Sequence, residues 1–355
     1  MNNIEEIRRE MEKRGLDAVL ITDEKNERYA AGFPFTDGGV LVGKNEAWLI
    51  TDSRYTEAAE MTVGSYMEVC TFPGMSLGAK VAQLLEKTGA RRLGVEEEKL
   101  SWAALERLRT EVGAELCGVK DLFTVLRAAK SAEELEYMRQ AQLISEKALH
   151  ETLPIIKPGM SEKELAAELV YRMLRHGSEG NSFDPIVVTG AKTSMPHGVP
   201  GDEIIHEGDF ITMDFGCIKG GYCSDMTRTV AVGRASEEMV NVYDTVLKAQ
   251  LAGIAAARAG IQGKEIDAAA RKVIADAGYG EYFGHGFGHS LGLDIHEPPN
   301  ANPREERLMP VGAVISAEPG IYLPGRFGVR IEDVLYLEEG GCQVITAFPK
   351  ELIIV

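Results

Sequence analysis

A pair of aspartates in the segment ITMDFGCIKGGYCSDMTRTV, residues 211–230, constrains the fold of this chain more than any other feature. Apolar and β-branched residues on both sides of a glycine pair predict two antiparallel strands, joined by a turn with Lys219 and Gly220 at its apex. That turn would place Asp214 directly opposite Asp225, with Cβ atoms about 4.5–5.5 Å apart. Two carboxylates at this distance repel each other, so the pattern favours a cation between them. A buried hydrogen bond is the alternative.

A second acidic pair lies in the segments ISAEPGIY and VRIEDV. A hairpin turning at Gly325 would bring Glu318 opposite Glu332 on neighbouring strands. The proline and glycines between them make this turn looser than the first. The two segments nevertheless predict a second cross-strand pair of carboxylates.

Three histidines occur close together in FGHGFGHSLGLDIHEPP, at positions 285, 289 and 296. The glycines allow close approach of the backbone, and the prolines exclude the continuous helix that an HExxH zinc motif requires. With the four acidic residues, His289 completes a set that could hold two divalent ions. A set rich in carboxylates and free of thiolates suits Mn²⁺ first, with Co²⁺ or Zn²⁺ as alternatives. His197 lies in the proline- and glycine-rich loop TSMPHGVPGD, where a functional and a structural role both fit.

Composition excludes several classes of protein. The chain of 355 residues has 45% hydrophobic and 26% charged residues, which is typical of a folded, water-soluble protein. A net charge of −17 argues against nucleic acid or an anionic membrane as the partner. The amphipathic start MNNIEEIRREMEKRGL lacks the apolar core of a signal peptide, and the five cysteines form no CxxC pair. We therefore expect a cytoplasmic protein with reduced thiols and no membrane span.

The order of predicted elements indicates two domains. Up to about residue 125, strands such as DAVLITD and RRLGVEE alternate with helices, including residues 77–88 and 101–112, as in an α/β domain. Capping boxes at Ser131/Glu134 and Ser161/Glu164 predict two new helices, and residues 236–258 and 263–277 two more. Most of the remaining chain after residue 180 reads as strands. We predict an α+β protein, with domains at 1–125 and 126–355, in which the second has a curved antiparallel sheet flanked by helices.

These segments resemble the pita-bread metallopeptidases of family M24, in particular the Xaa-Pro peptidase branch of prolidase and aminopeptidase P. The resemblance is carried by SFDPIVVTGAKTSMPHGVP, ITMDFGCIKGGYCSDMTRT, GHGFGHSLGLDIHEPP, ISAEPGIYLPG and VRIEDVLYL. The first domain is similar to the creatinase/prolidase N-terminal domain. Small departures before Asp214 and Glu318 remove none of the matching ligands.

The resemblance implies a role for each matching position. Asp214 would bind one ion, Asp225 and Glu332 would bridge two ions, and His289 and Glu318 would complete the set. The glutamate matching Glu318 also handles protons in this family. His197 and His296 match histidines that contact substrate or stabilise the intermediate, and Arg330 matches an arginine that orients the carboxylates.

The implied reaction is hydrolysis of the Xaa-Pro bond at the N-terminus of peptides, with a metal-bound hydroxide as the nucleophile. Phe183, Tyr322 and Arg326 are candidates for the proline pocket. The family also implies a homodimer. The alternatives are methionine aminopeptidase, metal-free creatinase and a catalytically inactive pita-bread module that binds peptides or proteins. The intact ligand set and the additional N-terminal domain argue against them.

Overall fold

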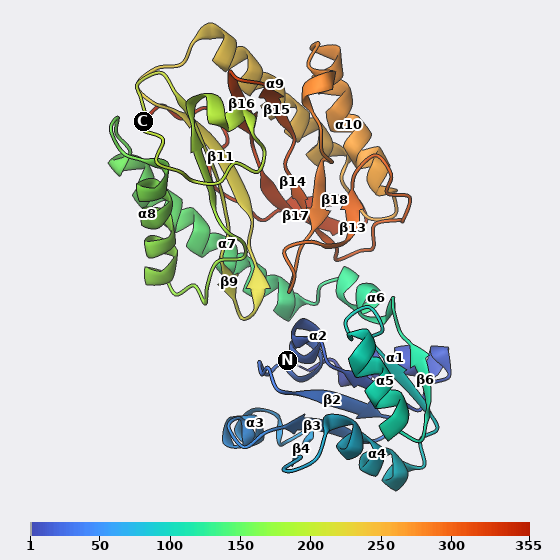
Figure 1. The fold of residues 1–355 in the computed structure, drawn as a ribbon. Helices are drawn as coiled ribbons and strands as arrows, with labels where there is room; N and C mark the ends of the chain where they lie inside the picture. Colours follow the sequence, from blue (N-terminus) through green and yellow to red (C-terminus); the bar gives the residue numbers. More distant parts are fainter. Residues whose placement is uncertain (1) are drawn as a thin grey trace. The chain divides into compact units, whose positions relative to one another are not determined.

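The computed structural model describes residues 2–355, which belong to two compact units, Met1–Arg127 and Ala128–Val355 (Figure 1). The first unit is α/β and the second is α+β, as the sequence predicts. All the residues proposed above as ligands or catalytic groups belong to the second unit.

The first unit is built on a six-stranded sheet in the order β4-β3-β2-β1-β5-β6. Strands β2 and β3 form an antiparallel hairpin, in which Val42 pairs with Ala47 next to the turn. Helix α4 has the predicted bounds, since Ser76 caps its start and Gly89 ends it in the left-handed conformation. The strands are β1 (Ala18–Ile21), β2 (Gly38–Gly43), β3 (Ala47–Thr51), β4 (Glu68–Thr71), β5 (Arg92–Val95) and β6 (Glu115–Gly118). The helices are α1 (Ile4–Arg14), α2 (Glu24–Ala31), α3 (Thr56–Val63), α4 (Leu77–Thr88), α5 (Trp102–Glu111) and α6 (Leu122–Ala128).

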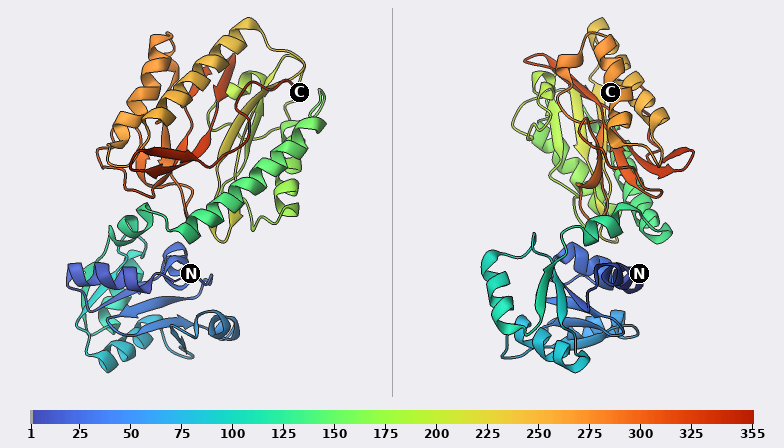
Figure 2. Two further views of the ribbon diagram at one scale, coloured as in Figure 1. Left: turned by 180° about the vertical axis from the view of Figure 1, so that it is seen from behind. Right: turned by 90° about the vertical axis from the view of Figure 1, so that its right-hand side faces the viewer.

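Four longer helices lie on one side of the strands in the second unit (Figure 2). They are α7 (Ala132–Thr152), α8 (Glu162–Arg175), α9 (Glu237–Ala256) and α10 (Gly263–Asp276). Both predicted capping boxes are present, at the starts of α7 and α8. Helices α7 and α8 share one apolar core with β7, β8 and β11, and α9 and α10 share another with β14 to β17.

All strand pairs of the second unit are antiparallel. Its sheets have the orders β11-β8-β7, β13-β12-β14-β17-β18, β10-β9 and β15-β16. The first strands are β7 (Ile186–Thr189), β8 (Phe210–Phe215), β9 (Ile218–Lys219), β10 (Tyr222–Cys223), β11 (Met226–Ala231) and β12 (Gly288–Ser290). The others are β13 (Glu297–Ala301), β14 (Val314–Ala317), β15 (Gly320–Leu323), β16 (Phe327–Arg330), β17 (Asp333–Glu338) and β18 (Gly341–Val344). Short 3₁₀ helices cover Leu153–Ile155, Gly190–Ser194 and Gly280–Tyr282.

The register predicted for the first aspartate hairpin is wrong by two residues. Asp214 pairs with Thr227, and Asp225 falls in the gap between β10 and β11. The turn is made by Gly220 and Gly221, whose φ angles are 59° and 83°. A tight hairpin turn needs positive φ at both central residues, which glycine adopts without strain and Lys219 would not. Because side chains alternate with a period of two, the shift leaves both aspartates on the same face.

The second hairpin has the register predicted about Gly325. Ala317 pairs with Asp333 in β14–β17, and Gly320 pairs with Arg330 in β15–β16. Glu318 and Glu332 therefore face each other in the gap between the two ladders. Both hairpins thus lose their regular pairing at acidic residues, the first at Asp225 and the second at Glu318 and Glu332, whereas Asp214 stays in the ladder.

A buried carboxyl group in the first unit predicts a pH-dependent stability. Burial, and then the charge of Glu96, raise the pKa of Glu27 in α2 to about 8. The folded chain therefore keeps a proton that the unfolded chain, with an ordinary pKa of 4.5, has released. The associated stability is complete below about pH 4.5 and is lost as the pH rises through about 8.

Replacing Glu27 by Gln is expected to raise the melting temperature by a few degrees at pH 9 and by little at pH 5. Differential scanning calorimetry of the full chain measures both values. Glu60→Gln, at an exposed position on α3, is the matched control, because its charge is not among those that raise the pKa of Glu27. An equal effect of Glu27→Gln at both pH values would contradict this prediction.

Candidate metal centre

Strand alternation places Asp214 on the face of β8 that points away from α7 and α8. Ile211, Met213 and Phe215 belong to the core shared with α7 and α8, so Asp214 projects from the opposite face. The same alternation in β11 turns Thr227 toward that face. Both side chains are buried.

The other acidic side chains and one histidine converge on this face from the gaps in the two hairpins and from β12. Ligand atoms of Asp225, His289 and Glu332 all lie within 4.8 Å of one another. The Nε2 atom of His289 lies 3.6 Å from Oδ2 of Asp225 and 3.3 Å from Oε1 of Glu318. The structure therefore brings these predicted ligand positions together, although they are distant in sequence.

Unpartnered oxygens show that this cluster fits a cation. Among residues 2–355, the buried side-chain atoms without a hydrogen-bond partner include Oδ1 of Asp214, Oδ1 of Asp225 and Oε1 of Glu332. A buried carboxylate oxygen without a partner is costly unless something positive compensates it. Carboxylate oxygens and an imidazole nitrogen are suitable donors for Mn²⁺, Co²⁺ or Zn²⁺.

The pKa values of the carboxylates also indicate that the cluster fits a cation. Burial, and then repulsion from Asp214, hold the pKa of Asp225 well above its ordinary value. Burial, and then repulsion from Asp225, do the same to the pKa of Glu332. Burial also raises the pKa of Asp214, although the charge of Arg330 opposes it. Without a bound cation, this cluster resists carrying its full negative charge.

His289 and Glu318 form an ion pair at the edge of the cluster. Burial alone would raise the pKa of Glu318 and lower that of His289. Their hydrogen bond and opposite charges overcome burial and bring the two pKa values to about 2 and about 9. The Nδ1 atom of His289 lies 3.2 Å from the carbonyl oxygen of Ser290, which leaves Nε2 directed at the carboxylates. A metal ion bound here would replace the proton on Nε2.

Arg330 orients two of the carboxylates. It donates to Oδ2 of Asp214 over 2.6 Å and to Oγ1 of Thr227 over 3.1 Å. The hydroxyl of Thr227 in turn donates to Oε2 of Glu332 over 2.7 Å. The position predicted from the resemblance is thus in direct contact with the cluster, and Thr227 is a contact that sequence reasoning missed.

Tyr322 and His285 extend this chain of hydrogen bonds. Arg330 donates to the Tyr322 hydroxyl over 2.8 Å, and that hydroxyl lies 2.9 Å from Nε2 of His285. Sequence reasoning assigned no role to His285 and offered Tyr322 only as a pocket residue. The available signal was strand alternation, which puts Tyr322 on the same face as Gly320, whose partner in the ladder is Arg330.

The cluster lies at a cavity of about 1150 Å³, large enough for a peptide rather than a single small molecule. Phe183, Tyr322, His197 and His296 line it. The ring of His296 lies 4.2 Å from that of His289, and burial, with the nearby His289, lowers its pKa. Arg326 does not line this cavity, and instead pairs with Glu238 on α9. Its half-exposed position at the β15–β16 turn explains the failure of that prediction.

The fold and this cluster are those of a metallopeptidase, and comparison with known proteins identifies the family. Residues 136–339 match the family model of metallopeptidase family M24, and residues 3–129 match that of the creatinase/prolidase N-terminal domain. The chain belongs to metallopeptidase family M24. The predicted resemblance and fold class are confirmed.

Individual relatives match almost the whole chain. The structure is similar to that of an Xaa-Pro dipeptidase from Bacillus anthracis, with 40% identity, a TM-score of 0.95 and 99% of both chains covered. It is also similar to an X-Pro aminopeptidase from Thermotoga maritima, with 37% identity, a TM-score of 0.93, and 98% and 100% covered. An Xaa-Pro dipeptidase of Pyrococcus horikoshii is 36% identical over 97% of this chain and 96% of its own.

The protein is therefore a metallopeptidase of the Xaa-Pro family, and this family implies divalent metal ions and a peptide substrate. In residues 2–355, none of the helices combines the length and apolar character needed to cross a membrane.

The carboxylate cluster predicts opposite effects of one substitution with and without metal. Asp225→Asn removes one of the repelling charges, so the metal-free protein is expected to melt about 2–4 °C higher for each kcal/mol of repulsion relieved. The same change removes a charged donor, so the stabilisation by added Mn²⁺ is expected to disappear. In the unsubstituted protein this stabilisation is about 2.7 kcal/mol at a hundredfold excess over Kd.

Thermal melts with EDTA and with Mn²⁺ measure both effects. Asp276→Asn, an exposed aspartate on α10, is the matched control and should keep the full Mn²⁺ response. A lower melting temperature of metal-free Asp225→Asn, together with an intact Mn²⁺ response, would be inconsistent with the cluster as a cation site.

Proposed function

We propose that this protein is a dinuclear metal hydrolase that cleaves the Xaa-Pro peptide bond at the N-terminus of peptides, as an Xaa-Pro aminopeptidase or an Xaa-Pro dipeptidase. The observation that carries this proposal is the convergence of unpartnered, buried carboxylate oxygens with His289 at a peptide-sized cavity. The names of the relatives add the preference for a bond to proline.

The donors divide into terminal and shared positions. Asp214 would hold one ion, Asp225 and Glu332 would be the ligands shared by both ions, as the resemblance implies, and His289 and Glu318 would complete the set. Two divalent ions bound here lower the pKa of water and polarise the scissile carbonyl. Mn²⁺ is the expected metal, with Co²⁺ or Zn²⁺ as alternatives, because the donor set is carboxylate-rich and has no thiolate.

The chain's own groups supply proton transfer and substrate contacts. Glu318 holds the position from which a carboxylate can take a proton from the attacking water and pass it to the leaving amine. In the metal-free protein, the hydrogen bond and the charge of His289 overcome the effect of burial and lower the pKa of Glu318 to about 2, so its carboxylate is ionised there. His296 has a lowered pKa and can donate a hydrogen bond from its neutral ring. His197, which also lines the cavity, would be the second histidine to contact the substrate.

The same cavity suits a substrate that lacks an amide hydrogen. An Xaa-Pro bond has no N–H, so enzymes that bind peptides as added β-strands recognise it poorly. The acidic cluster would hold the free N-terminal ammonium group, and the aromatic side chains of Phe183 and Tyr322 line the wall for the pyrrolidine ring. Arg330 keeps Asp214 in place while these groups bind.

The remaining parts of the proposal concern assembly and location. We propose a homodimer in the cytoplasm, in which residues 126–355 form the catalytic domain and residues 1–125 a non-catalytic domain. The five free cysteines are compatible with a reducing compartment.

The substrate proposal predicts Mn²⁺-dependent cleavage of Ala-Pro or Ala-Pro-Ala, and no cleavage of Ala-Ala-Ala under the same conditions. Mass spectrometry of the products measures each reaction. Activity on the dipeptide alone defines a dipeptidase, and activity on the tripeptide defines an aminopeptidase. Metal-loaded protein that cleaves neither proline peptide would instead support a peptide-binding module.

His197 allows substrate handling to be separated from metal binding. We expect His197→Ala to lower kcat about 10²-fold or more, the scale of a lost catalytic hydrogen bond, while the bound metal remains at the normal level. Steady-state kinetics and elemental analysis of the same sample test this pair of results. His206→Ala, a surface histidine, is the control. A loss of metal in His197→Ala would make His197 a ligand.

A further inference from the structure

The backbone around the two glutamates leaves the regular ladders of its own hairpin. The N–H of Glu332 donates across to the carbonyl oxygen of Thr227 over 3.1 Å, and that of Glu318 to the carbonyl oxygen of Phe287 over 2.8 Å. Buried carbonyl groups at such a break need other donors, because an unpaired one costs about 1–3 kcal/mol. The carbonyl group of Glu332 accepts a hydrogen bond from an arginine side chain, and that arginine fixes this part of the chain.

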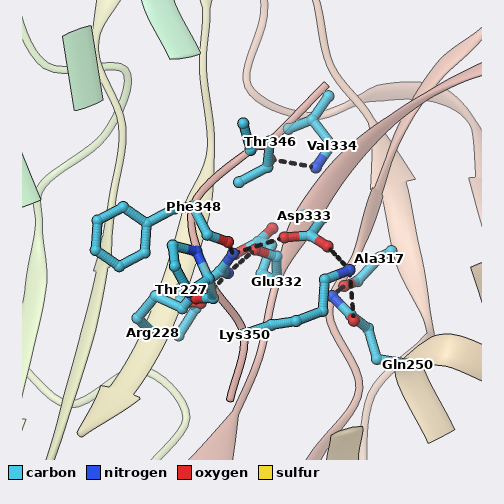
Figure 3. A network of polar contacts seen from close by, with 12 residues as sticks. Thr227, Arg228, Gln250, Ala317, Glu332, Asp333, Val334, Thr346, Phe348 and Lys350 are labelled. Carbon is cyan, nitrogen blue, oxygen red and sulfur yellow. Dashed lines mark hydrogen bonds and ion pairs between the residues drawn. The ribbon is translucent and has the colours of Figure 1, made fainter. Parts of the chain in front are cut away.

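Arg228 is that donor, and it has no role in the proposed chemistry. Its side chain is 1% exposed, and Nη1 donates to the carbonyl oxygen of Glu332 over 2.6 Å and to that of Thr227 over 3.0 Å (Figure 3). Nε donates to the carbonyl oxygen of Pro349 over 2.8 Å, and Nη2 to that of Phe348 over 2.7 Å. A further bond from Nη2 reaches Oδ1 of Asp333 over 2.8 Å. All five N–H groups of an arginine are used.

The acidic partner of Arg228 continues this network toward the second glutamate. Asp333 is fully buried and directly follows Glu332, and its Oδ2 pairs with Lys350 (Figure 3). Lys350 also contacts Oε1 of Gln250 over 3.3 Å, and Nε2 of Gln250 donates to the carbonyl oxygen of Ala317 over 3.3 Å. Ala317 directly precedes Glu318. One network therefore holds the main chain next to both glutamates.

Neighbouring residues of β11 hold Glu332 from two directions. Thr227 donates to its carboxylate, whereas Arg228, on the opposite face of the strand, donates to its main-chain carbonyl. The direction of the Glu332 carboxylate is thus defined at both ends of the residue. These bonds keep the Glu332 carboxylate in place although the neighbouring carboxylates repel it.

We propose that Arg228, with Asp333, Lys350 and Gln250, positions Glu318 and Glu332 for metal binding through their main chain. These are positioning residues, since none of the contacts above joins them to a ligand atom. The inference rests on the proposed dinuclear site. It predicts that the network sets the metal affinity of the folded protein, whereas a purely structural clamp would change only the stability of the metal-free fold.

The test is isothermal titration calorimetry of the full-length, metal-free protein with Mn²⁺, together with thermal melts in EDTA. Arg228→Met is expected to weaken Mn²⁺ binding about 10–100-fold, as does the loss of groups that orient ligands. Lys350→Met, at a partly exposed position, should produce a smaller loss, and Lys350→Arg should restore binding because it keeps the pair with Asp333. Arg172→Met on α8 is the matched control, since its partners are Glu168 and Glu151.

Normal Mn²⁺ affinity in Arg228→Met and Lys350→Met would overturn this inference, even if both variants melt at lower temperature. If Arg228→Met does not fold, the comparison of Lys350→Met with Lys350→Arg decides, because equal affinities would contradict the positioning role. Unsubstituted protein that binds no Mn²⁺ would contradict the proposed function as well. The two failures are therefore distinguishable.

Discussion

Repulsion between buried carboxylates is the constraint on which the catalytic unit depends. Asp214, Asp225 and Glu332 each have an oxygen without a hydrogen-bond partner, and burial with repulsion from neighbouring carboxylates raises their pKa values. Such an arrangement costs stability in the metal-free protein unless cations compensate the charge. The surrounding fold can therefore be understood as a frame that keeps like charges together until the ions bind.

Main-chain hydrogen bonds hold the ligand residues in position more than side-chain contacts do. Two hairpins keep one register on either side of a break, and Asp225, Glu318 and Glu332 lie in these breaks. At the second break, the N–H group of Glu332 bonds to Thr227 in β11 and that of Glu318 to Phe287, which directly precedes β12, instead of to their own ladder. The ligands are thus fixed by several strands at once, which gives precision that a single flexible loop would not provide.

Local sequence signals predicted much of this structure. Helix α4, the capping boxes of α7 and α8, and the turn about Gly325 depend on residues close together in sequence, and they are found as predicted. The turn of the first hairpin was predicted one residue too early. The sequence alone did not show which two of Lys219, Gly220 and Gly221 would take positive φ. The contacts of His285 and Arg228 were missed because they join segments far apart in sequence, which no local pattern reveals.

The central claim is that these carboxylates together bind two metal ions. Anomalous diffraction at the manganese edge, from crystals grown with Mn²⁺, tests it most directly. The account predicts two anomalous peaks about 3.5–4 Å apart, with Asp225 and Glu332 in contact with both and Asp214 in contact with one. A single peak, or none, beside carboxylates that remain protonated and paired with each other would contradict it.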